Sequence, residues 1–413
     1  MSNKRKIIND PVFGFITIPN NFLYKLIQHP FLQRLNRIRQ LGLASFVYPG
    51  AQHTRLHHSI GAMYLMDEAI NNLRIKGHEI TQEEANGALS CILLHDVGHG
   101  PFSHVLEHTL TNGIHHEELS LALMELLNKE LNGELDICIS IFKNEYHKKF
   151  LHQLVSGQLD VDRLDYLRRD SFFTGVTEGN IGSARIIKML DLRNDRLVVE
   201  AKGIYSIENF LMSRRLMYWQ VYLHKTAVAA EKMLIKTLDR AKYLTKKGIK
   251  LFASPSLCYF LENDVDPALF KDNNDDVLKH FVNLDDNDIW CALKVWAENE
   301  DIVLSKLSYS LINRNLFKIQ ITNEPLSKEE INKHIERYKD ELSISDDEAS
   351  FFYSSDVIYT NMYNEADDSI DILYNDGTIK DISEASDMLN IQLLSKKVEK
   401  HYFSYLRLDQ NYE

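Results

Sequence analysis

The sequence predicts a mainly α-helical protein with a smaller mixed α/β region near its C-terminal end. Apolar residues recur at helical spacing over most of the first 250 residues, and only eight prolines interrupt the 413-residue chain. Strand-like segments and a hairpin turn appear in about the last hundred residues. We therefore expect a helical core with an N-terminal extension at 1–250, a helical extension of that core at 251–324, and a mixed α/β region at 325–413.

Three helices are predicted within the core. The first spans 56–73, and the second spans 83–95 with an apolar stripe whose next position is Asp96. A third, very long helix is expected to begin after Ser206 as its N-cap and to stop at Gly248. A carboxylate on an apolar stripe needs a strong partner, so Asp96 is the first candidate for a functional residue.

The C-terminal third carries mixed signals. Ser327 followed by Glu330 forms a capping-box pattern, which predicts a helix start. Strands are expected near 315–322 and at 370–374, and the second is followed by Asn375-Asp376-Gly377, a common hairpin turn. These elements predict the mixed α/β character of this region.

Composition excludes several function classes. Forty-seven basic and fifty-nine acidic side chains give a net charge of -12, which disfavours a broad grip on nucleic acid or anionic lipid. The four cysteines form no C-x-x-C pair and are expected to be core thiols in a reducing cytosol. Because no targeting segment or run of about 18 apolar residues is found, we expect a cytoplasmic protein without a membrane span. Acid clusters at 272–276 and 285–288 lack EF-hand spacing and are expected to be solvated helix ends or loops.

Histidines are concentrated between positions 53 and 116. Ten of the seventeen histidines lie there: His53, His57, His58, His78, His95, His99, His104, His108, His115 and His116. A single histidine on a helix is usually a packed or surface residue, but a cluster favours a metal or catalytic site.

The sharpest pattern in this cluster is His95-Asp96, which ends an apolar helix directly before Val97-Gly98-His99-Gly100-Pro101. The glycines and proline turn the chain abruptly, so an imidazole and a carboxylate can point into one cavity. Such ligands suit Mn, Fe, Co, Ni or Zn, and the lack of a cysteine ligand argues against a closed structural zinc site. A second imidazole could come from His58 and a second carboxylate from 160–166.

These residues belong to motifs that resemble a known family. The motifs are Arg55-Leu-His-His58-Ser-Ile-Gly61, then His95-Asp96-Val-Gly-His99-Gly-Pro-Phe-Ser-His104, then Asp160-Val-Asp162-Arg163-Leu-Asp-Tyr166 through Asp170. The sequence resembles HD-domain phosphohydrolases over roughly residues 8 to 320. Within them it is most similar to dNTP triphosphohydrolases related to the sterile-alpha-motif and HD-domain protein, although no sterile-alpha-motif domain is present here.

The resemblance implies specific roles for residues of this chain. The catalytic metal would be bound by His58, His95, Asp96 and Asp162. Catalytic histidines would be His99, His104 and His116, with His104 preferred as the general acid. Substrate contacts are implied for Gln40, Arg55, Arg163, Tyr166, Asp170, Arg214, Tyr218, Tyr222, His224 and Lys225. A lysine is typical of the family at the position of Arg163, so the geometry of this arginine on phosphate is an open point.

Several of these residues have simpler alternatives. Arg55 suits a phosphate contact because it shares a helical side with His58, but a surface salt bridge is the alternative. His53 and His57 could bind a metal at i, i+4 spacing, yet they sit one register from the family ligand, so a packing or supporting role is favoured. His116 is selected over His115 by the motif, and an exposed histidine pair stays open.

The implied activity is hydrolysis of a dNTP to a deoxynucleoside and inorganic triphosphate, with Mg possibly accompanying the substrate. A homo-oligomer, dimer or tetramer, is also implied. Because Gln28 and Asn36 replace the aspartate and arginine of the regulated members, we predict no guanine-specific activation of that form. The alternatives are an HD-type phosphodiesterase or nuclease acting on oligonucleotides or cyclic nucleotides, and a non-catalytic nucleotide-binding regulator.

Overall fold

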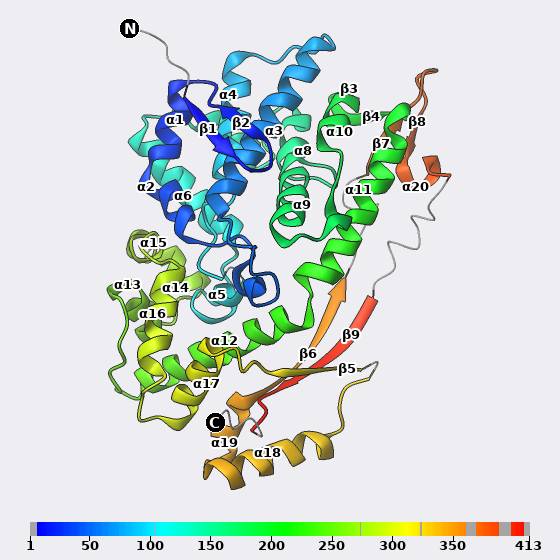
Figure 1. The fold of residues 1–413 in the computed structure, drawn as a ribbon. Coiled ribbons are helices and arrows are strands. Elements are labelled where there is room, and N and C mark those ends of the chain that lie inside the picture. Colours follow the sequence, from blue (N-terminus) through cyan, green and yellow to red (C-terminus); the bar gives the residue numbers. More distant parts are fainter. Residues whose placement is uncertain are drawn as a thin grey trace.

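The structure is a computed structural model that describes residues 6–102, 104–272, 274–322, 324–360, 369–387 and 398–408. Helices form most of the molecule, and the strands belong to three small sheets. The predicted fold class, mainly α with a mixed C-terminal region, is confirmed (Figure 1). None of the helices in these ranges is both long and apolar enough to span a membrane.

The N-terminal part of the chain begins with a β-hairpin and continues as helices. Its elements are β1 (Ile7–Asp10), β2 (Gly14–Thr17), α1 (Asn21–Gln28), α2 (Pro30–Arg34), η1 (Leu35–Arg37), η2 (Gly42–Phe46), α3 (Arg55–Ile75), α4 (Gln82–Leu94), α5 (His104–Thr109), α6 (His116–Glu130), α7 (Asp136–Phe142), α8 (Lys149–Val155) and α9 (Val161–Thr174).

The middle of the chain is also mainly helical. Its elements are η3 (Thr177–Gly179), α10 (Ser183–Met189), β3 (Leu190–Arg193), β4 (Arg196–Glu200), η4 (Ala201–Gly203), α11 (Ile204–Met217), η5 (Tyr218–Tyr222), α12 (Lys225–Lys246), α13 (Pro255–Glu262), α14 (Pro267–Asp272), α15 (Asn274–Phe281), α16 (Asp286–Trp296) and α17 (Ile302–Ile312). The C-terminal elements are β5 (Lys318–Thr322), α18 (Lys328–Leu342), α19 (Asp346–Ala349), η6 (Ser350–Phe352), β6 (Tyr353–Thr360), β7 (Asp371–Leu373), β8 (Ile379–Asp381), α20 (Ile382–Ala385) and β9 (Val398–Tyr405).

Two of the three predicted core helices are confirmed. Helix α3 matches the expected 56–73 and begins after Thr54, whose backbone N–H donates to Nδ1 of His57 at 3.2 Å. Helix α4 matches the expected 83–95, and Glu84 closes a capping box with the preceding threonine. These helices pack against each other, and α3 also packs on α9. Three helices thus meet where the histidine motifs lie.

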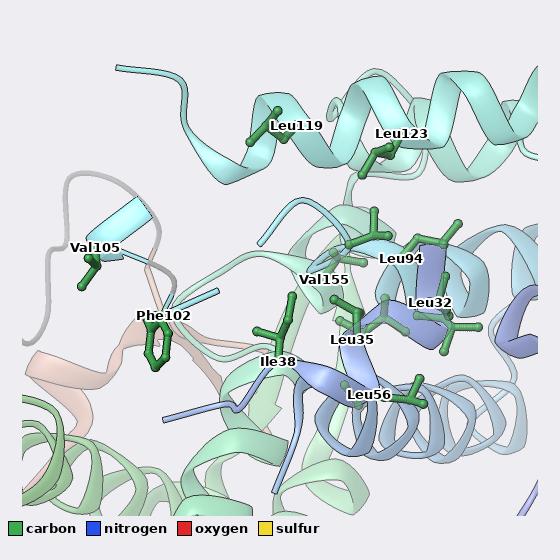
Figure 2. Packing of buried hydrophobic residues seen from close by; sticks show 14 of the residues in the cluster. Leu32, Leu35, Ile38, Leu56, Leu94, Phe102, Val105, Leu119, Leu123 and Val155 are labelled. Atoms are coloured by element: carbon green, nitrogen blue, oxygen red, sulfur yellow. The ribbon is translucent and has the colours of Figure 1, made fainter. Parts of the chain in front are cut away.

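The hydrophobic core fixes the end of α4 in place. Figure 2 shows Leu32 and Leu35 of the N-terminal segment packed near Leu56 of α3 and Leu94 of α4. All four side chains are buried. Because Leu94 directly precedes His95, the burial of its side chain in close packing restrains the backbone at this point.

The third predicted helix is wrong in its extent. Helix α11 is followed by a π-helical turn, η5, and a new helix, α12, starts after His224. His224 has an extended backbone, with φ -60° and ψ 125°, and its Nδ1 accepts from Thr226 N at 3.2 Å. Ser206 lies inside α11, whose N-cap is Gly203. No proline or glycine lies in 217–225 to mark the break, so the usual signals of a helix end are missing there.

The expected stop near Gly248 is confirmed, since α12 ends at Lys246 and Gly248 has a φ of +82°. In Figure 1 the axis changes direction between α11 and α12. This change matters for the site because the η5 turn between them carries two of the predicted substrate residues.

The C-terminal elements pair with the core. Strand β7 pairs parallel with β4, Ile372 opposite Val199, in the sheet β3-β4-β7-β8. Strands β5 and β7 confirm the predicted strands, and the β7–β8 hairpin confirms the turn. Helix α18 begins after Ser327 with the predicted capping box. The domain boundaries at 250 and 324 stay a prediction.

Two predictions about polar residues are wrong in part, since the 285–288 cluster lies at a helix end as expected but is not solvated, and only some cysteines are buried. Asp285 caps α16 and accepts from Arg37 Nε at 2.5 Å, while Asp286 is buried and accepts from Arg39 N at 3.0 Å. These carboxylates bind the N-terminal segment instead of being solvated, because that segment lies against α16. Among the cysteines, Cys91 and Cys138 are buried as expected, but Cys258 is half-buried and Cys291 is exposed.

Candidate active site

Three separate helices bring a group of possible metal ligands together. His58 lies on α3, His95 follows α4, and Asp162 is in the first turn of α9. Oδ1 of Asp162 lies 3.0 Å from Nε2 of His58 and 3.3 Å from Nε2 of His95. One donor atom from each residue lies within 4.8 Å of the others. Asp96 lies beside them, with Oδ1 3.3 Å from Nε2 of His95 and Oδ2 3.8 Å from Nε2 of His58.

The donor set fits a divalent transition metal. Nδ1 of His95 lies 2.6 Å from the carbonyl of Ile92, and Nδ1 of His58 lies 2.7 Å from Oδ2 of Asp165. Each imidazole thus commits Nδ1 to an acceptor and turns Nε2 towards the group. Nε2 of His58 is buried, and although Oδ1 of Asp162 lies 3.0 Å away, the angles between them do not form a hydrogen bond. Two imidazole nitrogens and carboxylate oxygens suit Mn, Fe, Co, Ni or Zn.

The charges around this group favour a cation. Burial disfavours the imidazolium of His58, but the carboxylates of Asp162 and Asp165 outweigh it and raise the pKa of His58 to about 10. The pKa of His95 is also raised, because Asp96 and Asp162 outweigh its burial. Burial acts against ionisation of Asp162, yet the two histidines hold its pKa well below the usual range. A positive charge is stabilised here, as a proton or a metal.

A buried arginine holds the turn after Asp96. Nη2 of Arg34 donates to the carbonyls of Val97 at 2.9 Å and His99 at 2.8 Å. Gly98 N donates to Oγ of Ser120 at 2.8 Å, and a Cβ on this glycine would lie 2.3 Å from the Ser120 nitrogen. Only glycine fits so close to α6, which explains its place in the predicted turn.

Two of the predicted catalytic histidines form a second cluster. His99 and His116 stack with ring centroids 3.9 Å apart, and Nε2 of His99 lies 3.3 Å from Oδ1 of Asp96. Burial and the charge of Arg55 lower the pKa of His99 to about 3, so this imidazole is neutral. Nδ1 of His116 lies 2.9 Å from Oε1 of Glu107. The side chain of His104, the predicted general acid, lies outside the described residues.

Two adjoining cavities meet at the site. The larger, about 570 Å³, is lined by the possible metal ligands His95, Asp96 and Asp162 together with His99, His116, His152 and Arg163. The smaller, about 320 Å³, is lined by Asp170, Tyr218 and Tyr222, among others. Gln40, Arg55 and Tyr166 line both. The cavities are large enough for a small-molecule ligand that reaches from one to the other.

The smaller cavity has an ordered polar wall. Tyr222 donates its hydroxyl to Oδ2 of Asp170 at 2.7 Å, and Nε2 of His53 lies 2.7 Å from Oδ1 of the same carboxylate. The ring of Tyr166 meets that of Tyr222 edge-on at 6.0 Å. Oε1 of Gln40 is buried and makes no hydrogen bond, so it can accept one from a ligand.

Both arginines at the larger cavity carry carboxylate partners. Arg55 is buried and donates from Nη1 to Oδ2 of Asp96 at 2.6 Å, so the alternative of a surface salt bridge is wrong. Arg163 pairs with Asp160, and this charge raises the pKa of the guanidinium although burial opposes it. Both guanidiniums lie at the wall of the larger cavity.

Three predicted substrate residues are not among those that line the two cavities. Arg214 donates from Nη1 to Oε1 of Gln158 at 3.0 Å, His224 caps α12, and Lys225 is exposed. Their substrate contacts stay predictions. His53 and His57 lie outside the group of possible ligands: the first bonds to Asp170, and the second caps α3. Their supporting roles stay predictions.

Sequence reasoning did not assign roles to Glu107 and Asp165. Glu107 lies nine positions before its partner His116, and Asp165 lies 107 positions from His58. Asp165 could have been suspected from its place one helical turn after Asp162 in α9. No local signal points to Glu107.

Three comparisons with known proteins show what the chain is similar to. A family model described as the HD associated region matches residues 181–253. The crystal structure of a phosphohydrolase from Bacteroides thetaiotaomicron is 64% identical with a TM-score of 0.95, covering 98% of this chain and 100% of that one. The uncharacterized protein YwfO of Bacillus subtilis is 32% identical over 76% of this chain and 72% of its own.

A deoxynucleoside triphosphate triphosphohydrolase, the SAMHD1 homolog of Dictyostelium discoideum, is 27% identical over 76% of this chain and 59% of its own length. The fold and the donor group thus define a phosphohydrolase of the metal-dependent kind. The chain belongs to the HD-domain phosphohydrolases, the family that its motifs resemble.

Proposed function

We propose that the protein is a dNTP triphosphohydrolase, which cleaves a dNTP to a deoxynucleoside and inorganic triphosphate. One observation carries this proposal: the cavity beside the possible metal ligands continues into a second cavity with an aromatic and carboxylate wall. The first suits a triphosphate beside cations, and the second suits a sugar and base. The Dictyostelium relative bears the name of this activity.

The chain supplies the charges and protons that the reaction needs. Water adds to the α-phosphorus, the bond from that phosphorus to O5′ breaks, and O5′ takes up a proton. His58, His95, Asp96 and Asp162 would hold an ion that, when bound, lowers the pKa of water and polarises the phosphoryl group. Mg would accompany the triphosphate.

Arginines and histidines of the larger cavity complete the proposed machinery. Arg55 and Arg163 would offset the phosphate charge, which reduces the cost of bringing the water oxygen close. Glu107 would orient the ring of His116 through Nδ1, and His104 would be the general acid that passes a proton to O5′. His99 is neutral and would donate or accept a hydrogen bond without carrying charge.

The sugar would contact Tyr166, Asp170 and Tyr222. Because Asp170 accepts from both Tyr222 and His53, its carboxylate is held in one orientation. Gln40 and Tyr218, which also line the smaller cavity, would meet the sugar or base. With these contacts, the 5′ end of the nucleoside would lie at the junction of the cavities.

The test is incubation of metal-loaded protein with each dNTP and NTP, with nucleoside, monophosphate and triphosphate products resolved by chromatography. We expect deoxynucleoside and triphosphate. The double variant His95→Ala, Asp96→Ala should release no product yet keep its helical circular dichroism spectrum, while His147→Ala, which removes an exposed histidine, should match the wild type. Mononucleotides released from a polymer, or tight nucleotide binding without turnover, would contradict the proposal.

We also propose a homo-oligomer that lacks guanine-specific activation. Gln33 donates its amide to the carbonyl of Ile27 at 2.7 Å, so this side chain is already engaged within the chain. Gln28 offers no carboxylate to guanine, and Asn36 offers no charge to phosphate. A titration with GTP or dGTP should leave turnover of another dNTP unchanged, and strong activation would contradict this.

A further inference from the structure

A network of buried charged side chains runs from Nδ1 of His58 to the N-terminal hairpin. Nδ1 of His58 lies 2.7 Å from Oδ2 of Asp165. The fork of Arg169 holds both oxygens of Asp165, with Nε and Nη2 each at 2.9 Å. Nη1 of Arg169 donates to Oδ2 of Asp10 at 2.7 Å. All four side chains are at most 2% exposed.

The network ends on backbone atoms of the hairpin. Asp10 is the last residue of β1, and its Oδ1 accepts from the N–H groups of Val12 and Phe13 at 2.9 Å each. The ring of Phe13 lies 5.6 Å from the guanidinium carbon of Arg169. The position of the hairpin turn therefore restricts Asp10 and, through it, Arg169.

Close packing of α3 on α9 leaves the side chains of this network little room to move. Gly61 faces it from α3, and a Cβ at this glycine would lie 2.1 Å from both Nη2 of Arg169 and Oδ1 of Asp165. Neither side chain can swing towards α3 even as it is. Because the carboxylate of Asp165 cannot turn, the imidazole of His58 is held with Nδ1 towards it and Nε2 towards Asp162.

Positive and negative charges alternate along this network, so each buried charge has a partner that offsets the free-energy cost of its burial. Carboxylates from Asp10 and Asp165 flank one guanidinium, and the Asp165 carboxylate also meets an imidazole. Breaking such a network by neutralising one member leaves another buried charge without its partner. A change at one end is thus transmitted as a change in hydrogen bonding at the next.

We propose that Asp165, Arg169 and Asp10 are positioning residues that fix His58 for the metal and link its geometry to the N-terminal hairpin. The inference rests on the proposed metal site. It assigns the hairpin a role in metal affinity, although no residue of the hairpin lines either cavity.

The experiment measures Co²⁺ affinity by competition with a chelator and records the visible absorption of the bound ion. We expect Asp165→Asn to raise the dissociation constant by about 10- to 100-fold. Asp10→Asn should raise it by a smaller factor of about three or more, because one intact pair still separates it from His58. In both variants the absorption bands should shift as the orientation of His58 changes.

Glu84→Gln is the matched control. Glu84 is a buried carboxylate that accepts from Lys148 at 2.7 Å and from the hydroxyl of Tyr146 at 3.0 Å, outside both cavities. Loss of its charge should lower the melting temperature of the metal-free protein but leave Co²⁺ affinity and absorption unchanged. If the network had only a structural role, all three variants would show a lower melting temperature with unchanged Co²⁺ affinity and absorption.

The outcomes separate the two levels of inference. If the wild type binds no Co²⁺, the proposed metal site is wrong, and the positioning role with it. If the wild type binds Co²⁺ and both Asp165→Asn and Asp10→Asn keep its affinity and spectrum, only the positioning role is overturned. If Asp165→Asn does not fold, Asp10→Asn decides, since that variant keeps the Asp165–Arg169 pair.

Discussion

Metal binding by the apo protein should release protons. The carboxylates of Asp162 and Asp165 raise the pKa of His58 to about 10, so near neutral pH its imidazole is protonated before an ion arrives. A histidine must be unprotonated to bind a metal. Adding Mn²⁺ to metal-free protein should therefore displace about one proton from His58.

The size of the effect follows from this pKa. Between a pH of 7.5 and a pKa of about 10, deprotonation costs about 3 kcal/mol at 1.36 kcal/mol per unit. Affinity should therefore rise about tenfold per pH unit below the pKa, or about 100-fold from pH 7 to pH 9. The raised pKa of His95 should steepen this rise at its lower end.

The assay is isothermal titration of Mn²⁺ into metal-free protein in two buffers with different ionisation enthalpies. The difference in apparent binding enthalpy gives the number of protons released. His147→Ala serves as the control, because it removes an exposed histidine that lines neither cavity and should release the same number. Equal apparent enthalpies in both buffers, together with an affinity that does not change from pH 7 to pH 9, would refute the reasoning.

Three further predictions follow from packing, burial and hydrogen bonding. Gly61→Ala should destabilise the protein by about 1–3 kcal/mol in thermal unfolding, because its Cβ would overlap Asp165, whereas Gly182→Ala, where the nearest atom is 3.9 Å away, should change little. Burial raises the pKa of Asp286 to about 6, so its contribution to stability is present below about pH 4 and lost as pH rises through about 6. Asp286→Asn should therefore stabilise the protein by up to about 3 kcal/mol at pH 8 and by much less at pH 4 in urea unfolding; an equal effect at both pH values would contradict this. Tyr222→Phe removes the hydroxyl that donates to Asp170 and should lower kcat/KM for a dNTP by about 10- to 100-fold in steady-state assays, with metal content unchanged; an unaltered kcat/KM would exclude a role in substrate binding.

Local sequence patterns predict the elements that are specified by residues close together in the sequence. Helices α3 and α4 follow from their apolar stripes, and α18 follows from its capping box. Asp96 was found because it interrupts a stripe, which is a local signal of a functional residue. The break between α11 and α12 gave no such signal, because an extended histidine and a π-turn replace the usual glycine or proline.

The residue types that can bind a metal and phosphate were readable from the sequence, and the family motifs indicated which of them to choose. Their partners were not readable, since an ion pair such as His58–Asp165 joins positions 107 apart. Whether Arg55 faced solvent or Asp96, and whether Asp286 was solvated or buried, also depended on which helices pack together. Chemistry is a property of side chains and is written locally, whereas burial, charge pairing and the shape of a cavity arise only when distant segments meet.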